Sequence, residues 1–441
     1  MNKGNSDELY ITYFFPPDNQ VSGINVFKRI VENKRQVDVL HAKHTLGDNS
    51  NIINEYVANH ITVDVDYNYD WAEFIFEFIK QGLKSINKKY DKIYSRSWLM
   101  ANHFLAAEYK FQSGDVIWTA EFSDPLIYDI TNKAKRYKEM IIDNKEYISK
   151  INGNIKDYNK IHSTSFDLVK NKTSAYYIAE YLVYLFADNI VFTNENQCEV
   201  MLNQFPQDIK EHISDKIIIK AHTTLPEKYY TIKDVDLDLD NDCLNIAYFG
   251  SDYYSLRHFE SLFYAVDSIY HKDKIKIYLY LTDDKLIKNI IKTLNSPDCF
   301  HVKKSLDYFE FLNATTKFDI LIVNDLITKN NFKINPYLPS KLSDYKGSST
   351  NIWAFYEKGS VLSKQNLKYK SDIHDLDGCR EEFLKILYEF GYLEKYYVDE
   401  DYLFKRLTSL NQLYEKEYHK NIKTKKNNTS MIKKAINKLR K

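Results

Sequence analysis

Seven consecutive residues, Pro339 to Tyr345 (PSKLSDY), combine groups that bind anions with a carboxylate. They follow an apolar strand candidate and a loop, so we expect a helix to begin here with Ser340 as its N-cap. The free N–H groups of a helix start, its positive dipole end and the ammonium of Lys341 would all favour a diphosphate. Asp344 shares the helix face of Lys341, and its carboxylate would accept hydrogen bonds from a ribose diol. This spacing predicts a binding site for a nucleoside diphosphate.

A structural explanation of the same residues stays open. Ser340 then only caps a helix, and Lys341 forms with Asp344 an exposed ion pair that contributes roughly a few tenths of a kcal/mol. Arg257 favours the diphosphate explanation, because it follows the first strand expected in the second half and would add a cation to the same edge. Its own alternative is an exposed ion pair on a helix.

The first half carries further candidates where predicted strands end, which is where α/β folds hold functional residues. Glu121 and Asp124 follow one strand, and either carboxylate would orient a hydroxyl or act as a catalytic base. Asp124 before Pro125 also fits a helix N-cap. Arg96 ends another strand, and its guanidinium suits an acceptor phosphate or the sugar of a donor. His103 on the following helix is a candidate catalyst, with packing in the core as the alternative.

The composition indicates a globular protein with more than one core. The chain has 441 residues, of which 44% are hydrophobic and 28% charged, and this length favours two domains. No apolar run approaches the roughly 20 residues of a membrane span, and the N-terminus lacks the order of a signal peptide. The cysteines and histidines show no metal-ligand spacing, so we expect free thiols, a cytoplasmic protein, and neither a metal nor a cofactor.

The charge is unevenly distributed, although the formal net charge is zero. Residues 419–441 carry nine Lys or Arg and no acid, and apolar residues recur there at helical spacing. A short basic amphipathic helix suits an anionic membrane surface, so we expect peripheral attachment to the inner face of the cell membrane, with a solvated terminus as the alternative. The body of the chain has no basic stripe with interleaved aromatics, so nucleic acid is not an expected partner. Whether homo- or hetero-oligomers form stays open.

Strand and helix patterns alternate along the chain, which is typical of doubly wound α/β domains. The strands expected in the first half are 9–15, 37–41, 92–95, 116–122, 189–193 and 216–221. Those expected in the second half are 244–249, 275–281, 318–323, 352–355 and 361–362. Their continuous apolar character indicates parallel strands covered on both faces. We therefore predict an α/β protein of two Rossmann-like domains, with the ligand site in a cleft between them.

The predicted domain boundaries follow from changes in composition. We expect an N-terminal domain at 1–230, with a lysine-rich helical insertion near 133–170, and then an acidic linker at 231–242. A second domain would cover 243–380, and helices at 381–418 would pack back across the domain junction.

Two such domains followed by helices resemble a glycosyltransferase of the GT-B fold, and the local motifs resemble glycosyltransferase family 4. Residues 339–347 followed by Asn351–Phe355 are similar to that family's Ser-Lys-Leu-x-Glu-Tyr helix start, turn and buried strand. The loop FFPPD with Gly23 after it resembles the first strand-to-helix loop of these enzymes. The segment YFGS, which contains Gly250 and leads to Arg257, resembles the region where the family places a cation against the donor diphosphate.

The resemblance implies a hexosyltransferase that retains the anomeric configuration and uses a nucleoside diphosphate sugar, with a UDP-sugar as the expected donor. The residues that it places at the donor are Arg257, Ser340, Lys341, Asp344 and Gly250. The first domain would present the acceptor near Gly23, Arg96, Glu121 and Asp124. That acceptor would be a hydroxyl of a cell-surface glycan, a teichoic-acid-like polymer or a lipid-linked sugar.

Two positions differ from the family pattern. Asp344 stands where Glu is usual, and Ser348–Asn351 replaces a Gly-Lys-Pro or Gly-Thr-Pro turn. These differences motivate an alternative, a non-catalytic GT-B subunit that binds glycan or stabilises a partner transferase. An epimerase on the same fold is a third possibility.

Overall fold

The computed structural model describes residues 6–43, 53–66, 71–128, 130, 140–251, 256–269, 273–282 and 284–392. The chain divides into two compact units, Met1–Leu225 and Pro226–Lys441, and each unit is described by itself. Both units are built around a parallel β-sheet, as the alternating pattern predicts.

The first unit contains a seven-stranded parallel sheet with the order β3-β2-β1-β4-β5-β8-β9. Its strands are β1 (Glu8–Ile11), β2 (Val37–Ala42), β3 (Val57–Val63), β4 (Lys92–Ser97), β5 (Ile117–Phe122), β8 (Asn189–Phe192) and β9 (Ile217–Ile219). The order runs outward in one direction from β1 and in the other from β4. The carboxyl ends of β1 and β4 therefore form the switch point at which open α/β sheets bind ligands.

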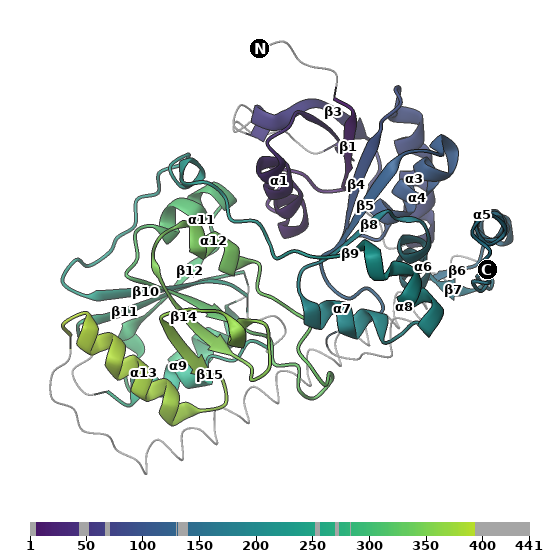
Figure 1. Ribbon diagram of the computed structural model, residues 1–441. Helices are drawn as coiled ribbons and strands as arrows, with labels where there is room; N and C mark the ends of the chain where they lie inside the picture. Colours follow the sequence, from purple (N-terminus) through teal and green to yellow (C-terminus); the bar gives the residue numbers. More distant parts are fainter. Residues whose placement is uncertain are drawn as a thin grey trace, which may run out of the picture. The chain divides into compact units, whose positions relative to one another are not determined.

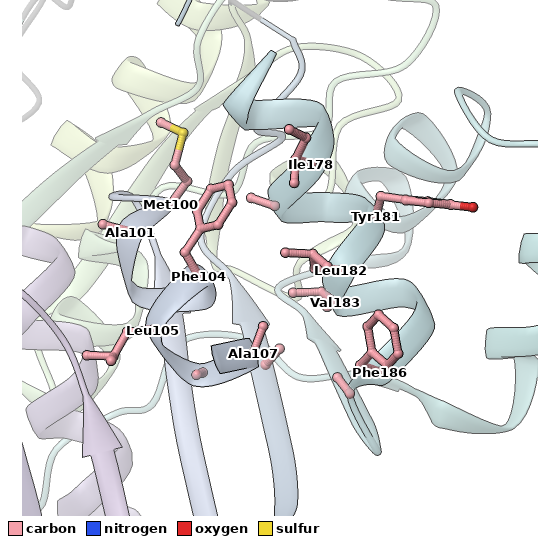
Figure 2. Packing of buried hydrophobic residues seen from close by; sticks show 14 of the residues in the cluster. Met100, Ala101, Phe104, Leu105, Ala107, Ile178, Tyr181, Leu182, Val183 and Phe186 are labelled. Atoms are coloured by element: carbon pink, nitrogen blue, oxygen red, sulfur yellow. The ribbon is translucent and has the colours of Figure 1, made fainter. Parts of the chain in front are cut away.

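Helices cover both faces of this sheet, with α1 on one face and α3, α4 and α6 on the other (Figure 1). The helices are α1 (Val21–Asn33), α3 (Trp71–Ser85), α4 (Ala101–Ser113), α5 (Lys145–His162), α6 (Ala175–Phe186), α7 (Glu195–Leu202) and α8 (Gln207–Ile213), with short 3₁₀ turns η1 (Asn54–Tyr56) and η3 (Ser214–Lys216). Figure 2 shows α4 and α6 packed together, with Phe104 and Ala107 facing Leu182 and Val183. Because α6 is buried on nearly all sides, its sequence is apolar almost all round.

The predicted helical insertion near 133–170 corresponds, within the described residues 140–174, to one helix and a short two-stranded ribbon. β6 (Ile141–Ile142) pairs antiparallel with β7 (Thr173–Ser174), and α5 lies between them in sequence. Ile148, Ile151 and Ile155 of α5 are buried in the core of the first unit. The apolar spacing along α5 therefore attaches this insertion to the unit.

The second unit contains a six-stranded parallel sheet with the order β12-β11-β10-β13-β14-β15. Its strands are β10 (Leu244–Gly250), β11 (Ile275–Leu281), β12 (Phe300–Lys304), β13 (Ile320–Asn324), β14 (Asn351–Tyr356) and β15 (Tyr369–Asp372). Counted along the chain, this is the strand order 3-2-1-4-5-6 of a Rossmann fold, with its switch point between β10 and β13.

The helices of the second unit also lie on both faces of its sheet (Figure 1). They are α9 (Glu260–Asp267), α10 (Lys285–Ile291), α11 (Tyr308–Thr315), α12 (Lys341–Gly347) and α13 (Leu376–Glu389), with 3₁₀ turns η4 (Glu227–Tyr230), η5 (Pro297–Cys299) and η6 (Leu362–Lys364). Trp353 of β14 stacks on Phe383 of α13, which joins the sheet to its covering helix. None of the helices in the described parts of the chain has both the length and the apolarity to cross a membrane.

The predicted α/β fold of two Rossmann-like domains is confirmed, with corrections to individual elements. The strand expected at 361–362 is wrong, because Leu362 begins the 3₁₀ turn η6. Three strands of the two large sheets were not predicted, β3, β12 and β15, and all three are edge strands; the short pair β6 and β7 was not predicted either. The helices expected at 381–418 are described only up to residue 392, and the rest of this range and the basic tail at 419–441 lie outside the described residues.

The acidic segment expected as a linker belongs to the second unit. The predicted first domain ends at residue 230, whereas the structure groups residues from Pro226 onward with the second unit. Within that unit the backbone N–H of Val235 donates to Asn313 Oδ1 at 3.0 Å, and Lys317 Nζ lies 2.7 Å from Asp234 Oδ1. Aspartates that look like solvated linker residues in the sequence therefore pair with side chains of the folded unit.

We expect Gly23→Ala to destabilise the first unit by about 1–3 kcal/mol. A Cβ at residue 23 would lie 2.5 Å from the carbonyl oxygen of Phe14, and that oxygen already accepts a 2.8 Å hydrogen bond from Thr12. Urea unfolding followed by circular dichroism measures the loss. The control is Gly153→Ala in α5, where a Cβ meets nothing within 4 Å, so that it should gain up to about 1 kcal/mol. Equal unfolding midpoints for the two variants would contradict this account.

Candidate functional site

The predicted helix start at Ser340 is present, but the Ser340 side chain does not cap it. α12 covers Lys341–Gly347, and Ser340 already has helical dihedrals, φ −60° and ψ −30°, with no capping hydrogen bond from its hydroxyl. Its carbonyl oxygen instead accepts hydrogen bonds from the N–H and the hydroxyl of Ser343, at 3.1 and 2.7 Å. Ser340 therefore occupies the predicted N-cap position, but its side chain does not supply the expected capping hydrogen bond. A proline-led turn begins this helix instead, since Leu342 N donates to Pro339 O.

Lys341, the first residue of α12, packs against aromatic side chains. Its Nζ is 4.2 Å from the ring centroid of Phe311 in α11, a cation–π geometry. Phe311 is buried and contacts the rings of Phe249, Tyr308 and Tyr345. Packing between α11 and α12 thus orients the ammonium of Lys341, the predicted phosphate-binding residue.

Asp344 is buried and held from two sides by tyrosines. Tyr308 donates a 2.9 Å hydrogen bond to Asp344 Oδ1, and Tyr230 donates a 2.5 Å hydrogen bond to the Asp344 carbonyl oxygen. Gly347 makes room for the second contact, because a Cβ there would lie 2.1 Å from the Tyr230 hydroxyl. A carboxylate has about four acceptor positions, so Tyr308 takes one of them and fixes the orientation of the group.

Arg257 lies near the carboxyl ends of β10 and β13. Its Nη1 donates to the Tyr248 hydroxyl at 3.4 Å, and Gly250 leaves space for that hydroxyl, 2.7 Å from where its Cβ would be. Burial raises the pKa of Tyr345 well above its usual value, and the charge of Arg257 opposes this rise. The structure therefore brings Arg257, Gly250 and the α12 residue Tyr345 together at the switch point.

Asp325 is a functional candidate that was not predicted. It directly follows β13, is fully buried, and its Oδ2 accepts hydrogen bonds from Ser360 Oγ at 2.5 Å and from Glu357 N at 3.0 Å. Its Oδ1 is buried and has no hydrogen-bond partner among the described residues. Burial raises its pKa to about 7, Glu357 adds to the rise, and Arg257 opposes it. The sequence signal that could have identified Asp325 as a candidate is its position directly after a predicted strand.

Glu357 fixes the loop that leads from β13 to α12. Its carboxylate accepts four hydrogen bonds from this loop, at 2.7–3.0 Å. The donors are the N–H and hydroxyl of Thr328, the N–H of Lys329 and the side-chain amide of Asn335. Since a buried carboxylate needs hydrogen bonds, this contact holds the start of α12 at the edge of the sheet.

In the first unit, Glu121 forms the centre of a buried charged cluster. Strand register places Arg96 of β4 beside Glu121 of β5, and Arg96 Nε lies 3.1 Å from Glu121 Oε1. Arg29 of α1 donates through Nε at 2.8 Å and Nη2 at 3.2 Å, and the Tyr94 hydroxyl donates at 2.5 Å. Burial alone would raise the pKa of Glu121, but the two arginines outweigh it and lower the pKa to about 2. So weak a base favours a positioning role over the predicted catalytic one.

Asp124 and His103, two other predicted residues of the first unit, differ in their exposure to solvent. Asp124 is exposed, and no helix begins at Pro125 in the described stretch 125–128, where Glu180 Oε1 instead accepts the N–H groups of Leu126 and Ile127. The helix-cap alternative for Asp124 is therefore not realised there. His103 is fully buried, its Nδ1 is 2.8 Å from Ser95 Oγ, and burial and then Arg96 lower its pKa to about 3. This environment keeps the ring neutral within the core. Its catalytic role stays a prediction.

Gly23 has a packing role that explains its identity. A Cβ at this position would lie 2.5 Å from the Phe14 carbonyl oxygen, so only glycine fits without a shift. The resemblance predicts that Gly23 lies near an acceptor, and that remains a prediction. Sequence inspection missed Arg29, Tyr94 and Tyr308, whose roles depend on partners far away in the chain. No group of three His, Cys, Asp or Glu side chains able to hold a metal occurs among the residues that the structure describes.

Comparison with known proteins finds similarity in structure only. No family model matches the sequence, and no curated protein is similar to it in sequence. The chain is similar to Anabaena HepE, crystallised with UDP-glucose, at 8% identity and a TM-score of 0.53, covering 93% of this chain and 98% of HepE. It is similar to the lipopolysaccharide outer core galactosyltransferase WaaB at 8% identity and a TM-score of 0.50, covering 95% and 99%.

A third similar structure belongs to another class of enzyme. The UDP-GlcNAc 2-epimerase of Neisseria meningitidis, crystallised with UDP-GlcNAc, matches at 9% identity and a TM-score of 0.50, covering 93% of this chain and all of the epimerase (100%). Together these likenesses show that the protein has the GT-B fold of two Rossmann-like domains. Membership of glycosyltransferase family 4 remains a prediction.

Glu121→Gln should lower the unfolding free energy of the first unit by about 3–5 kcal/mol, because it leaves the buried guanidinium of Arg96 without its carboxylate partner. The matched control is Glu32→Gln. Glu32 also pairs with Arg29 but is 35% exposed, so its replacement should cost less than about 1 kcal/mol. Urea unfolding at neutral pH compares the two. Similar losses for both variants would refute the importance given to Glu121.

Asp325 should make the stability of the second unit depend on pH. Its folded pKa of about 7 exceeds the ordinary 3.8, so the folded state holds a proton that the unfolded state releases between these values. The unfolding free energy contributed by this group therefore falls as pH rises through that window. Asp325→Asn should be more stable than wild type at pH 8, by on the order of a few kcal/mol.

Urea unfolding between pH 5 and pH 8 measures this effect. Asp298→Asn, an exposed position in the same unit, serves as the control and should keep the wild-type profile. Parallel pH profiles for wild type and Asp325→Asn would show that Asp325 does not carry a proton in the folded state.

Proposed function

We propose that the protein is a glycosyltransferase that moves a sugar from a nucleoside diphosphate sugar to a hydroxyl group. The observation that carries this proposal is the arrangement at the switch point of the second unit. There α12 presents Lys341 and Asp344, and Arg257 lies beside β10 close to Tyr345 of the same helix. Similar GT-B structures that hold UDP-glucose or UDP-GlcNAc support a nucleotide-sugar donor.

In this proposal Lys341 and Arg257 bind the diphosphate, and Asp344 binds the ribose diol. The bond from the anomeric carbon to the β-phosphate oxygen breaks, and the departing UDP takes the electron pair. Positive side chains that face this developing charge stabilise the transition state more than the ground state. Tyr308 keeps the Asp344 carboxylate in one orientation, so the ribose meets a preorganised acceptor.

The acceptor hydroxyl forms the new bond to the anomeric carbon and gives up its proton. In the proposal the first unit presents this hydroxyl at the carboxyl ends of β4 and β5, near Arg96 and Asp124. Asp124 is the exposed carboxylate of that edge and is the proposed base. Retention of the anomeric configuration follows only from the family resemblance.

The proposal also covers the nature of the acceptor and the location of the protein in the cell. A glycan or lipid-linked acceptor at the inner face of the cell membrane fits the basic segment 419–441, which lies outside the described residues. Such a segment would bring the enzyme to acceptors held at an anionic surface.

Two further functions fit particular observations. An epimerase is favoured by the similarity to the Neisseria UDP-GlcNAc 2-epimerase. A non-catalytic subunit is favoured by Asp344, because the shorter carboxylate is already bound by Tyr308. Both alternatives use the same fold, so product analysis must separate them.

Calorimetry with UDP tests donor binding. We expect Lys341→Ala and Arg257→Ala each to weaken UDP binding about 10- to 100-fold, because each removes a charge-assisted hydrogen bond to phosphate. Lys346→Ala is the matched control, since Lys346 is on the same helix but exposed and bonded to Gln365. It should bind UDP as wild type does.

Turnover separates the remaining possibilities. Mass spectrometry of a panel of UDP-sugars with cell-envelope acceptors should show sugar transfer. Conversion of the UDP-sugar without an acceptor into another UDP-sugar would indicate the epimerase. Absence of UDP binding, together with unchanged behaviour of Lys341→Ala, would favour the non-catalytic subunit.

A further inference from the structure

Arg96 is buried, yet part of its hydrogen-bonding capacity is unused. Its side chain is 2% exposed, and its Nε donates to Glu121. Within the described parts of the chain, its terminal nitrogens Nη1 and Nη2 have no hydrogen-bond partner. Neither nitrogen is fully buried, so the Nη edge keeps some solvent access and can offer its N–H donors to an acceptor group of a ligand.

His222 adds a second unused group to the same place. Its Nδ1 is buried and has no partner in the described residues, while the residue as a whole is partly exposed. Burial lowers the pKa of His222 well below its usual value, and Arg96 and Lys28 lower it further, whereas Glu121 opposes them. Arg29, which shares Glu121 with Arg96, donates to Lys220 O at 3.0 Å and to Thr223 Oγ1 at 2.9 Å, so the segment that carries His222 lies at this charged cluster. The field at the ring is predominantly positive. A bound anion would offset that field.

The position of Arg96 in the fold is one that ligands reach. Arg96 lies at the carboxyl end of β4, which with β1 forms the switch point of the first sheet. Trp98 follows two residues later, is 44% exposed, and contacts Phe14 of the loop after β1 at a ring separation of 6.0 Å. This exposed indole, two residues after Arg96 at the end of the same strand, offers a flat surface on which a sugar ring can stack.

We propose that Arg96, His222 and Trp98 form a site for the acceptor, and that the acceptor sugar carries an oxyanion, either a carboxylate or a phosphate. This inference rests on the proposed function, because it assigns the second substrate to the first unit. The Nη edge of Arg96 matches two oxygens of such a group. Glu121 and Tyr94 are positioning residues, since Glu121 holds the Nε side of Arg96 and Tyr94 holds Glu121.

A neutral sugar would not satisfy this site equally well. Its hydroxyl groups can accept hydrogen bonds, but they bring no negative charge to a buried edge lined by Arg96, Arg29 and Lys28. Arg96 and Arg29 share the carboxylate of Glu121, so an oxyanion would supply further acceptors and further negative charge at this edge. We therefore expect the acceptor site to select for negative charge as well as for the shape of the sugar.

The test measures binding of three monosaccharides to the full chain by calorimetry at low salt, with UDP present to fill the donor site. The probes are methyl glucuronide, glucose 6-phosphate and methyl glucoside. We expect at least one of the two anionic sugars to bind about tenfold more tightly than methyl glucoside. Preference for methyl glucuronide identifies a carboxylate site, and preference for glucose 6-phosphate identifies a phosphate site.

Arg96→Gln should remove the preference for the anionic sugar, and the exposed control Lys346→Ala should leave it unchanged. His222→Gln is the second variant. It leaves the Arg96–Glu121 pair intact and should reduce the preference even where Arg96→Gln fails to fold by circular dichroism. Equal binding of all three probes would overturn the inference. So would a preference that survives in both His222→Gln and a folded Arg96→Gln.

UDP binding is measured separately on the same samples, so the two proposals fail in different ways. UDP binding without any preference for anionic sugars overturns the acceptor inference and leaves the proposed donor site standing. Preference for an anionic sugar without UDP binding supports the Arg96 site and overturns the proposed nucleotide-sugar donor.

Discussion

The need to satisfy buried carboxylates is the constraint on which both candidate sites depend. A carboxylate inside a protein is tolerated only when donors or cations surround it. Glu121 meets this requirement with Arg29, Arg96 and Tyr94, and Glu357 meets it with the loop after β13. Each carboxylate therefore determines where its donors lie. The proposed donor and acceptor residues are held in place by these contacts before any ligand binds.

The central part of each sheet could be predicted from sequence because its strands are buried on both faces and read as apolar runs. The missed strands β3, β12 and β15 lie at sheet edges and carry residues such as His60, Lys303 and Lys370. One face or edge of such a strand meets solvent, so selection for apolar residues is weaker. β9 is also an edge strand, and its three consecutive isoleucines made it predictable although none of them is buried.

The candidate sites were predictable only to the extent that local spacing defines them. Lys341 and Asp344 could be placed on one helix because their separation is a property of the helix itself. The partner of Asp344 is Tyr308, 36 residues earlier, and the partner of Glu121 is Arg29, 92 residues earlier. Pairing over such distances is decided by the topology of the sheet and the packing of helices. A single sequence contains no local signal for it.

Tyr230 connects two parts of the second unit that sequence keeps far apart. Tyr230 belongs to η4, where the chain enters the unit. Its hydroxyl occupies the space beside Gly347 at the end of α12. The absence of one methyl group at position 347 is thus what allows the entry segment and the site helix to share a hydrogen bond. A side chain of any size there would push against the tyrosine. The course of the chain into the unit and the placement of Asp344 would then change together.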